Sequence, residues 1–356
     1  MDDILEYAGQ IIPINESIKS EVEKYIDNLT KPVGALGQLE EIVIKLAGIQ
    51  GTKNINIDKK VVVIMCADNG VCDEGVSECP QEVTYQVTSN FTKGITGINR
   101  MTSFSKSDIY IVDIGIKGEV RSPLVHQKKI REGTSNMCLG SAMTREEAIK
   151  AVSIGIESAE GLVKAGYQVF GTGEMGVGNT TTSAAVLSVL TGEAVKNVVG
   201  RGSGVKEETF IRKANVICKA ISKNNPDKED VIDTLAKVGG FDLAGLCGVF
   251  LGAAKNQKAV VIDGFISAVA ALCACKIEPK CAQYMFPSHM SKETGMGVAM
   301  KALNMEPYFH VEMRLGEGTG CTLTFQLMDM ALHTLYTMGT FEDAAIEKEN
   351  YIGIWK

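Results

Sequence analysis

The sequence predicts an α/β fold built on a parallel, doubly wound sheet, and three observations lead to this prediction. Short apolar segments, rich in β-branched residues and typical of buried strands, recur along the 356 residues. Helical patterns separate these segments, as the crossovers between parallel strands require. Polar and glycine residues follow directly after the strands, where ligands bind in such sheets. We therefore expect a large Rossmann-like α/β domain over residues 56–324, with a ligand cleft at the carboxyl ends of its strands.

The first 55 residues predict helices. Apolar residues recur three and four positions apart in residues 20–29 and 36–49, which is the spacing of amphipathic helices. Pro32 and Gly34 mark the join between the two helices, because both residue types interrupt a helix. Residues 53–60 form a polar linker that leads into the sheet.

The strands of the sheet are expected after this linker. The first, VVVIMCA at residues 61–67, ends directly before Asp68. A helical pattern over residues 81–101 follows it, and an apolar helix is expected over residues 265–275. The remaining strands are expected, in chain order, at residues 108–114, 167–171, 259–262 and 281–286.

The last thirty residues return to helical patterns, over residues 328–336 and 340–356, with no strand pattern between them. They resemble the N-terminal segment in this respect. We therefore expect residues 1–55 and 325–356 to pack together as a small helical domain.

The composition excludes several classes of protein. Charged residues make up 22% of the chain, the net charge is −7 and the pI is about 5.4, so no basic surface for nucleic acid is expected. The apolar runs are far shorter than the ~20 residues of a membrane span. The acidic start MDDILEYAGQ is unlike a signal peptide. We expect a cytoplasmic protein with no membrane span and no nucleic-acid partner.

The ten cysteines contain no CxxC pair, and none of the four histidines stands at metal-ligand spacing from a cysteine. This pattern predicts reduced thiols and no metal site. The acidic residues between Asp68 and Glu82 would suit a divalent cation. However, Glu78 and Glu82 stand near a helix start, where the helix macrodipole favours acids in any case.

The richest motif is GTGEMGVGNTTTS, which begins at Gly171 and runs into an apolar helix. Its glycines allow backbone N–H groups to turn toward an anion, and the helix N-terminus adds partial positive charge. Asn179 and Thr180 supply further donors or caps. The motif is neither a Walker A loop nor a dinucleotide fingerprint, because the required lysine and the later ribose-binding acid are missing. A phosphate cradle is favoured over a ligand-free turn.

Two further polar segments would serve the same phosphate. GRGSG, at residues 200–204, is a second glycine-rich turn, and it precedes a helical segment that contains Lys213. FPSHMSKETG offers Ser291, which could instead be only a helix N-cap. For His289 in the same segment, a structural role is favoured over catalysis, since no nucleophile motif accompanies it.

A single acidic residue stands in the late segment RLGEGTGCTL. Glu317 lies between Gly316 and Gly318, just before an apolar helical run. Glycines let a backbone approach a ligand closely or adopt left-handed dihedrals. The segment is therefore either a plain turn or a loop that presents a catalytic carboxylate.

Eight segments together resemble one family. In chain order they are TKPVGALGQLE, ADNGVCDEGVS, GTGEMGVGNTT, KVGGFDLAGLCGVFLGAA, VIDGFISAVAAL, FPSHMSKETG, MEPYFHVEMRLGEGTG and MGTFEDA. On these segments the chain resembles the nicotinate-nucleotide:dimethylbenzimidazole phosphoribosyltransferases, the CobT family of cobamide biosynthesis, from about residue 20 to residue 345.

The resemblance implies a pentosyltransferase (EC 2.4.2.21) that moves phosphoribosyl from nicotinate mononucleotide to an aromatic base. The base would be 5,6-dimethylbenzimidazole or a related benzimidazole, purine or phenolic, and the product an α-ribotide. It implies no cofactor. It also implies a dimer, with itself or with a paralogue, of subunits that have a large parallel-sheet domain and a small helical domain.

The family's functional positions carry over by the matching motifs. Glu317 matches the general base, and Met175 and Leu315 match apolar walls of the base pocket. The residues that match the phosphate and ribose site are Glu174, Gly176, Asn179, Thr180, Gly202, Ser203, Lys213, Asp263 and Ser291.

The base pocket departs from the family pattern. A serine and a glutamine commonly reach the benzimidazole, whereas this chain has Cys79 and Val87 at the corresponding positions, with Ser77 and Gln86 as neighbours. These changes leave the reaction class intact and the preferred base open.

The chemistry needs one carboxylate. The pyridinium of nicotinate mononucleotide leaves as a neutral ring, so the paired acid of a glycosidase is unnecessary. Glu317 would take the proton of the attacking base. Two alternatives stay open: a non-catalytic nucleotide-binding paralogue or partner subunit, and, less favoured, an NAD-dependent dehydrogenase.

Overall fold

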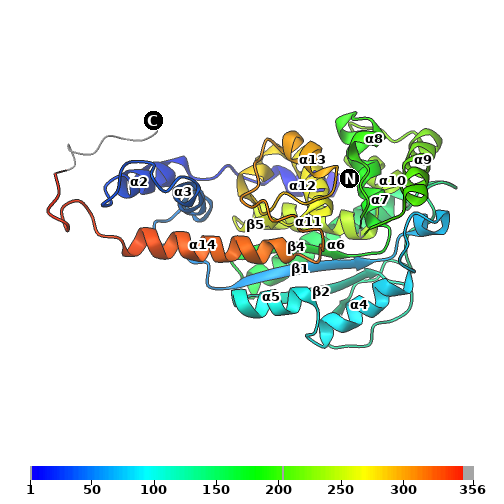
Figure 1. The fold of residues 1–356 in the computed structure, drawn as a ribbon, viewed down its shortest axis with the longest axis horizontal. Helices are drawn as coiled ribbons and strands as arrows, with labels where there is room; N and C mark the ends of the chain where they lie inside the picture. The colour runs from blue at the N-terminus through cyan, green and yellow to red at the C-terminus, as the bar shows by residue number, and fades with distance from the viewer. Residues whose placement is uncertain (1, 203, 348–356) are drawn as a thin grey trace.

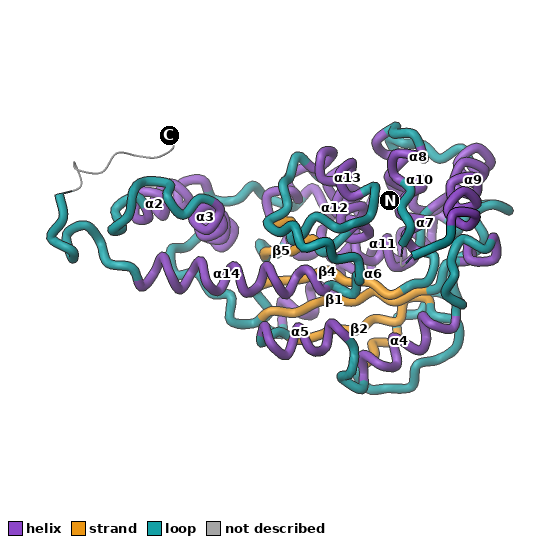
Figure 2. The backbone as a smooth tube through the Cα atoms, viewed as in Figure 1, coloured by secondary structure: helices purple, strands orange, loops and turns teal. Residues whose placement is uncertain are grey.

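A computed structural model describes residues 2–202 and 204–347, and within them lies a six-stranded, fully parallel sheet in the order β3-β2-β1-β4-β5-β6 (Figures 1 and 2). This confirms the predicted fold class. The strands are β1 (Lys60–Ala67), β2 (Asp108–Gly115), β3 (Val125–Gln127), β4 (Val169–Met175), β5 (Ala259–Ile262) and β6 (Met285–Pro287).

The helices are α1 (Asp2–Gly9), α2 (Glu16–Ile26), α3 (Gln38–Gln50), α4 (Glu82–Thr92), α5 (Gly97–Ser105), α6 (Arg145–Lys164), α7 (Asn179–Thr191), α8 (Val195–Val198), α9 (Glu207–Asn224), α10 (Val231–Val238), α11 (Phe241–Lys255), α12 (Phe265–Ile277), α13 (Met296–Leu303) and α14 (Thr319–Thr337). Short 3₁₀ segments lie at Gly70–Glu74 and Pro279–Tyr284.

The strand order reverses between β1 and β4. From β1 the chain proceeds outward through β2 and β3 on one side, and then returns to build β4, β5 and β6 on the other. β1 is buried along its whole length and pairs with both β2 and β4. A crevice opens beyond the carboxyl ends of strands at such a reversal, which is where ligands bind in doubly wound folds.

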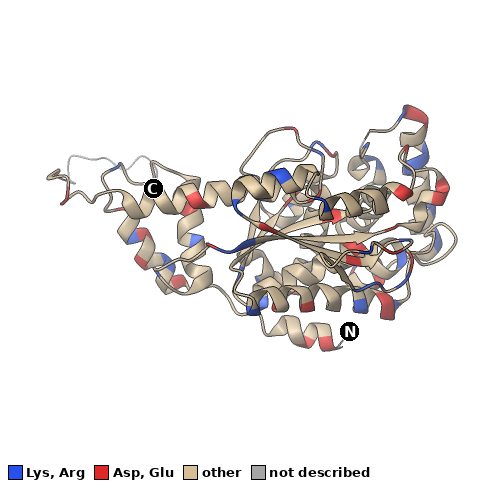
Figure 3. Cartoon of the chain, turned by 90° about the horizontal axis from the view of Figure 1, so that it is seen from below, with Lys and Arg blue, Asp and Glu red and all other residues tan. Residues whose placement is uncertain are grey.

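Helices cover both faces of the sheet. α11 packs across β1, β2, β4 and β5, and α6 packs on α11, while α4, α5 and α14 contact the opposite face. Gly155 of α6 and Gly248 of α11 allow these two helices to touch backbone to backbone, because a Cβ at either glycine would collide with the other helix. Lys, Arg, Asp and Glu are interspersed along the outer helices in Figure 3. Within residues 2–202 and 204–347, no helix combines the length and the apolarity that a membrane crossing demands.

The N- and C-terminal helices pack together, as predicted. α3 contacts α14, and Leu29 and Thr340 form an isolated β-bridge. α2, α3 and the end of α14 project from the sheet as a separate group in Figure 1. α1 lies elsewhere: the Tyr7 hydroxyl donates to Glu160 of α6, so this helix packs on the body that contains the sheet.

Most differences from the expected elements have local causes. The short edge strand β3 was not predicted. Residues 281–284 form a 3₁₀ turn, and only Met285–Pro287 are strand, since Pro279 favours a tight helical start. The helix expected over residues 81–101 is two helices, separated at Gly94, which has a φ of +72°.

The helix expected over residues 340–356 is wrong for the described part, residues 340–347. This part forms turns, in which Thr340 Oγ1 donates to Asp343 at 2.7 Å and Ala345 has a φ of +52°. A left-handed residue ends a helical turn. The remainder of the expected helix lies outside the described residues.

Gly173 of β4 packs against the backbone of the loop before α14. A Cβ at this position would lie 2.5 Å from the carbonyl oxygen of Glu317. We therefore expect Gly173→Ala to destabilise the protein by about 1–3 kcal/mol, the usual cost of overpacking. Thermal unfolding followed by circular dichroism measures this change. Gly161→Ala is the matched control, because a Cβ there meets nothing within 4 Å; equal stabilities of the two variants would contradict the expectation.

Candidate active site

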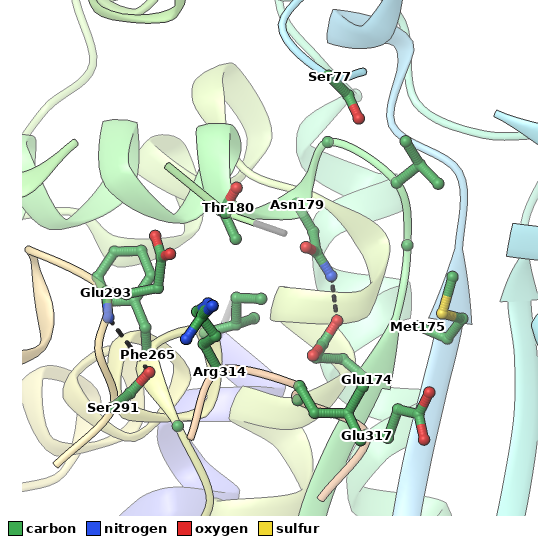
Figure 4. Close-up of a pocket in the computed structure, with 18 of the residues that line it drawn as sticks. Ser77, Glu174, Met175, Asn179, Thr180, Phe265, Ser291, Glu293, Arg314 and Glu317 are labelled. Atoms are coloured by element: carbon green, nitrogen blue, oxygen red, sulfur yellow. Dashed lines mark hydrogen bonds between the residues drawn. The ribbon is translucent and has the colours of Figure 1, made fainter. Parts of the chain in front are cut away.

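A cavity of about 270 Å³ opens beyond the carboxyl ends of the central strands. β4 supplies its floor through Glu174 and Met175. The start of α7, the turn after β5 and the segment before α14 form part of the wall. Figure 4 shows the arrangement: Ser291, Glu293 and Arg314 lie on one side, Met175 and Glu317 on the other, and Glu174 between them.

The fold brings most of the predicted site residues to this cavity. Those that line it are Ser77, Cys79, Val87, Glu174, Met175, Gly176, Asn179, Thr180, Gly202, Lys213, Asp263, Ser291, Leu315 and Glu317. Gln86 is exposed on α4 and is not among the lining residues. Ser203 lies outside the described residues.

Glu317 occupies a strained loop. Gly316, Glu317 and Gly318 have consecutive positive φ angles of +78°, +61° and +85°. Left-handed backbone is costly for a residue with a side chain, and it persists where the surrounding structure enforces it, often at functional sites. The loop is therefore held in place by its contacts.

The conformation of this loop places the Glu317 carboxylate in the cavity wall beside α5. The side chain is 9% exposed, and the backbone N–H of Ile98, in the first turn of α5, donates to its carboxylate. Its Oε2 has no hydrogen-bond partner in residues 2–202 and 204–347. Burial raises the pKa of Glu317, although the Ile98 N–H opposes the shift. An ionised Glu317 is thus a strengthened base with one oxygen free to accept a proton.

Asp263 holds the loop that contains Glu317 in place. Its Oδ2 accepts the N–H of Gly318 at 3.1 Å, and its Oδ1 accepts the N–H of Gly320 at 2.6 Å. A carboxylate in this position satisfies N–H groups at the start of α14. Burial raises the pKa of Asp263 to about 7, and the two N–H groups lower it.

Two more buried carboxyl groups meet at the centre of the site. Asn179 donates through Nδ2 to Glu174 and, at 3.1 Å, to Asp242 of α11. Burial raises the pKa of Glu174 to about 8, with the Asp242 charge adding to the effect, and burial raises that of Asp242 to about 6. Both carboxyl groups therefore ionise less readily than free ones, and a cationic ligand beside them would favour their ionised forms.

The opposite side of the cavity carries cationic and hydroxyl groups. Lys213 of α9 is 1% exposed, and its Nζ donates to Thr180 Oγ1 at 2.7 Å. Burial lowers the pKa of Lys213 to about 8. Gly202 lies beside both residues, since a Cβ there would be 3.1 Å from Thr180 Oγ1 and 3.7 Å from Lys213 Nζ. With the start of α7, these groups suit a phosphate.

Apolar side chains form the remaining wall. Val76, Val83 and Val87, from the loop after β1 and from α4, face the cavity together with Met175 and Leu315. Leu315 is 57% exposed. Ser77 Oγ accepts the N–H of Cys79 at 3.1 Å, which ties the two candidate base-contacting residues into one turn. A flat aromatic ring fits against a wall of this kind.

Comparisons with known proteins agree with this geometry. Residues 11–346 match a family model described as phosphoribosyltransferase. The nicotinate-nucleotide–dimethylbenzimidazole phosphoribosyltransferase of Clostridium acetobutylicum is 52% identical over 334 residues, which cover 94% of this chain and 95% of that protein. The enzyme of the same name from Clostridium tetani is 48% identical and covers 98% and 96%.

The chain belongs to this phosphoribosyltransferase family. Its fold also matches the crystal structure of CobT from Thermus thermophilus, with a TM-score of 0.89, 36% identity, and coverage of 93% of this chain and 99% of that one.

Several cavity residues of this CobT-family protein were not predicted as site residues. Glu293, Arg314 and Phe265 needed the folded structure, because their segments gave only helical or polar patterns. The same holds for Asp242, which lies behind the cavity wall and contacts the cavity residue Asn179. His289 also lines the cavity, but it is buried and packs against Gly320, and its Nδ1 lies 3.1 Å from Ser288 Oγ. Burial lowers the pKa of His289, which fits the structural role expected for it.

Proposed function

We propose that the protein transfers the 5-phosphoribosyl group of nicotinate mononucleotide to 5,6-dimethylbenzimidazole or a related base. The products are α-ribazole 5′-phosphate and nicotinate, in the assembly of the cobamide nucleotide loop (EC 2.4.2.21). One observation carries the proposal. A buried carboxylate with a free oxygen, Glu317, shares one cavity with an apolar wall and a phosphate-type pocket around Lys213.

Glu317 is the general base of the reaction. As one benzimidazole nitrogen attacks C1′ of the ribose, Glu317 Oε2 removes the proton from the other nitrogen, so no net cation builds up on the base. The nicotinate leaves as a neutral ring and needs no acid. General-base assistance of this kind contributes about 10²- to 10⁴-fold.

The rest of the site aligns the two substrates. Lys213, Thr180, Gly202 and Ser291 hold the 5′-phosphate, and this remote binding energy positions C1′. The buried carboxyl groups around Glu174 favour the positive charge that the pyridinium brings and that the ribose ring develops as the bond breaks. The base lies against Met175 and Leu315, with Ser77, Cys79 and Val87 at its far edge.

The test is an incubation with nicotinate mononucleotide and a panel of bases, in which ribotides are identified by mass. The panel contains 5,6-dimethylbenzimidazole, benzimidazole, adenine and p-cresol. We expect transfer to the benzimidazoles, because Cys79 and Val87 keep this end of the pocket apolar. Absence of transfer to every base would reject the enzyme in favour of a nucleotide-binding paralogue or a partner subunit.

The pH dependence of kcat/KM for nicotinate mononucleotide should be bell-shaped. Activity is lost as the pH falls through the raised pKa of Glu317, because the base becomes protonated. It is lost again as the pH rises through about 8, where Lys213 loses the proton that binds phosphate. Lys213→Arg should move the alkaline limb to higher pH, since arginine does not titrate in this range. An unchanged alkaline limb in this variant would remove Lys213 from the explanation.

We further propose that the protein is a homodimer, or a heterodimer with a paralogue. Leu315 at the cavity, Ile95, and Phe104 on α5 are more than half exposed, and exposed large apolar side chains of this kind suit a subunit contact. Light scattering after size exclusion would report a monomer if this is incorrect. All ten cysteines are free of disulfides, which supports the cytoplasmic location that we propose.

We also propose a division into a small helical domain, residues 1–55 and 325–356, and a large domain, residues 56–324, with α1 of the first segment packed on the large domain. Limited proteolysis tests it, because cleavage should then concentrate near residues 53–60.

A further inference from the structure

Glu293 is an acidic residue in the part of the cavity that otherwise suits an anion. It lies in the turn before α13 and is 8% exposed. Its own N–H donates to Ser291 Oγ at 3.4 Å, so the two residues share one turn (Figure 4). This carboxylate has no role in the proposed phosphoribosyl transfer.

The Glu293 carboxylate sits among the groups that would hold a phosphate. The N–H of Gly202 donates to it, and Lys213 and Arg314 attract it. Gly200 provides the space, since a Cβ there would lie 2.1 Å from Glu293 Oε2. Glycine-rich turns with inward N–H groups are anion sites, and here the turn around Gly200 and Gly202 encloses a carboxylate.

The carboxylate is nevertheless incompletely bound. Glu293 Oε2 has no hydrogen-bond partner among the described residues, and within the same residues Lys213 forms no ion pair shorter than 4.0 Å. A buried acceptor without a partner is unfavourable. Glu293 is thus held only in part: one N–H binds it, one of its oxygens has no partner, and it forms no close ion pair with Lys213. We expect a side chain held in this way to be displaceable by a stronger ligand.

A phosphate dianion cannot share these donors with an ionised carboxylate, because both are acceptors and their charges repel. From this conflict we infer that Glu293 is a built-in occupant of the phosphate subsite. Its carboxylate takes the place of the substrate phosphate while the subsite is empty and moves aside when the phosphate binds. Glu293 is therefore a positioning residue, and it sets the affinity for the phosphate. This inference rests on the proposed function, which assigns the phosphate to this side of the cavity.

The competition has a pH signature. Burial raises the pKa of Glu293, and the charge of Lys213, the N–H of Gly202 and the charge of Arg314 lower it. Protonation at low pH removes the competing charge, whereas ionisation at high pH strengthens the competition. Arg201 also lines the cavity, but it forms an ion pair with Glu207.

Calorimetric titration with inorganic phosphate, over a range of pH, compares the wild type with Glu293→Gln. Glutamine preserves the shape and removes the charge, so we expect phosphate to bind at least about tenfold more tightly at pH 7, where Lys213 keeps its proton. The ratio of the two dissociation constants should approach one as the pH falls and Glu293 becomes protonated. Titration of the phosphate is common to both proteins and cancels in the ratio. Titration of Lys213 does not cancel, because the charge of Glu293 raises the pKa of Lys213, so the comparison is made below the pKa of Lys213, which is about 8.

Two further variants complete the test. Glu312→Gln is the matched control, because Glu312 is exposed, pairs with Lys292 at 2.9 Å and lies outside the cavity lining. It should change phosphate binding by less than about twofold. Glu293→Asp withdraws the charge from Gly202 by one methylene and should show an intermediate affinity. Because phosphate stabilises only the folded protein, thermal unfolding with and without phosphate also shows whether each variant folds.

The outcomes separate the two proposals. Weaker phosphate binding in Glu293→Gln, or a ratio that does not depend on pH, would overturn the inference and make Glu293 a direct ligand or a structural residue. Failure of the wild type to bind phosphate and to use nicotinate mononucleotide would instead overturn the proposed function.

Discussion

Glu317→Gln should lower kcat by about 10²- to 10⁴-fold, the range of general-base assistance. The amide keeps the shape of the side chain and can still accept the N–H of Ile98, so the loop should stay folded. KM for nicotinate mononucleotide should change little, because Thr180, which accepts the hydrogen bond of Lys213, lies on the other side of Glu174 from Glu317 (Figure 4). Steady-state kinetics with 5,6-dimethylbenzimidazole measures both constants.

A comparison of two bases distinguishes proton removal by Glu317 from orientation of the ring. Electron-withdrawing substituents make the benzimidazole N–H more acidic, so 5,6-dichlorobenzimidazole depends less on an external base. The loss in Glu317→Gln should therefore be smaller with the dichloro than with the dimethyl compound. An equal loss with both would indicate that Glu317 orients the ring and does not accept its proton, and normal turnover would remove Glu317 from the mechanism.

Most of the residues that the sequence assigned to one site lie together in the structure, and they come from segments with a distinctive local pattern. The glycine frame of Glu317 and the turn after β4 have unusual composition, and the parallel sheet brings the carboxyl ends of its strands together. The glycines on either side of Glu317 indicate an unusual backbone, which is consistent with its strained φ of +61°. The conformation itself, however, depends on Asp263, which is distant in the chain and reaches the loop only through the fold.

The site residues that the sequence did not predict have their contacts with segments that are distant in the chain. Asp242 begins an otherwise apolar helix, and only packing places it at Asn179. Glu293 follows Ser291 in a polar segment, where a solvated charge is the ordinary expectation. Gln86, by contrast, was favoured by its neighbourhood in the chain, but one turn of α4 directs it to solvent and Val83 and Val87 to the cavity. Adjacent residues of a helix are separated by about 100° of rotation. A residue next to a pocket position in the sequence therefore faces another direction.

Asp263→Asn should lower kcat although Asp263 takes no part in proton transfer. The carboxylate accepts two N–H groups, from Gly318 and Gly320, with its two oxygens. An asparagine can accept only one of them, and its NH₂ group would face the other N–H. The three left-handed residues before α14 would then relax, which would displace the Glu317 carboxylate. A displacement of about 1 Å is enough to cost roughly 10²-fold in rate.

The same change should also destabilise the empty protein by about 1–3 kcal/mol, because a buried N–H loses its acceptor. A buried aspartate outside the cavity provides the matched control. Asp113 follows the same pattern at the end of β2, where it accepts the N–H of Ile116 at 2.9 Å and pairs with Lys129 at 3.4 Å. Asp113→Asn should therefore lower stability by a similar amount and leave kcat within about threefold, since nothing that it holds carries a reacting group. If both variants lost stability and activity in parallel, the effect of Asp263 would be one of folding, whereas a loss of kcat confined to Asp263→Asn identifies the clamp that holds the catalytic loop in its strained conformation.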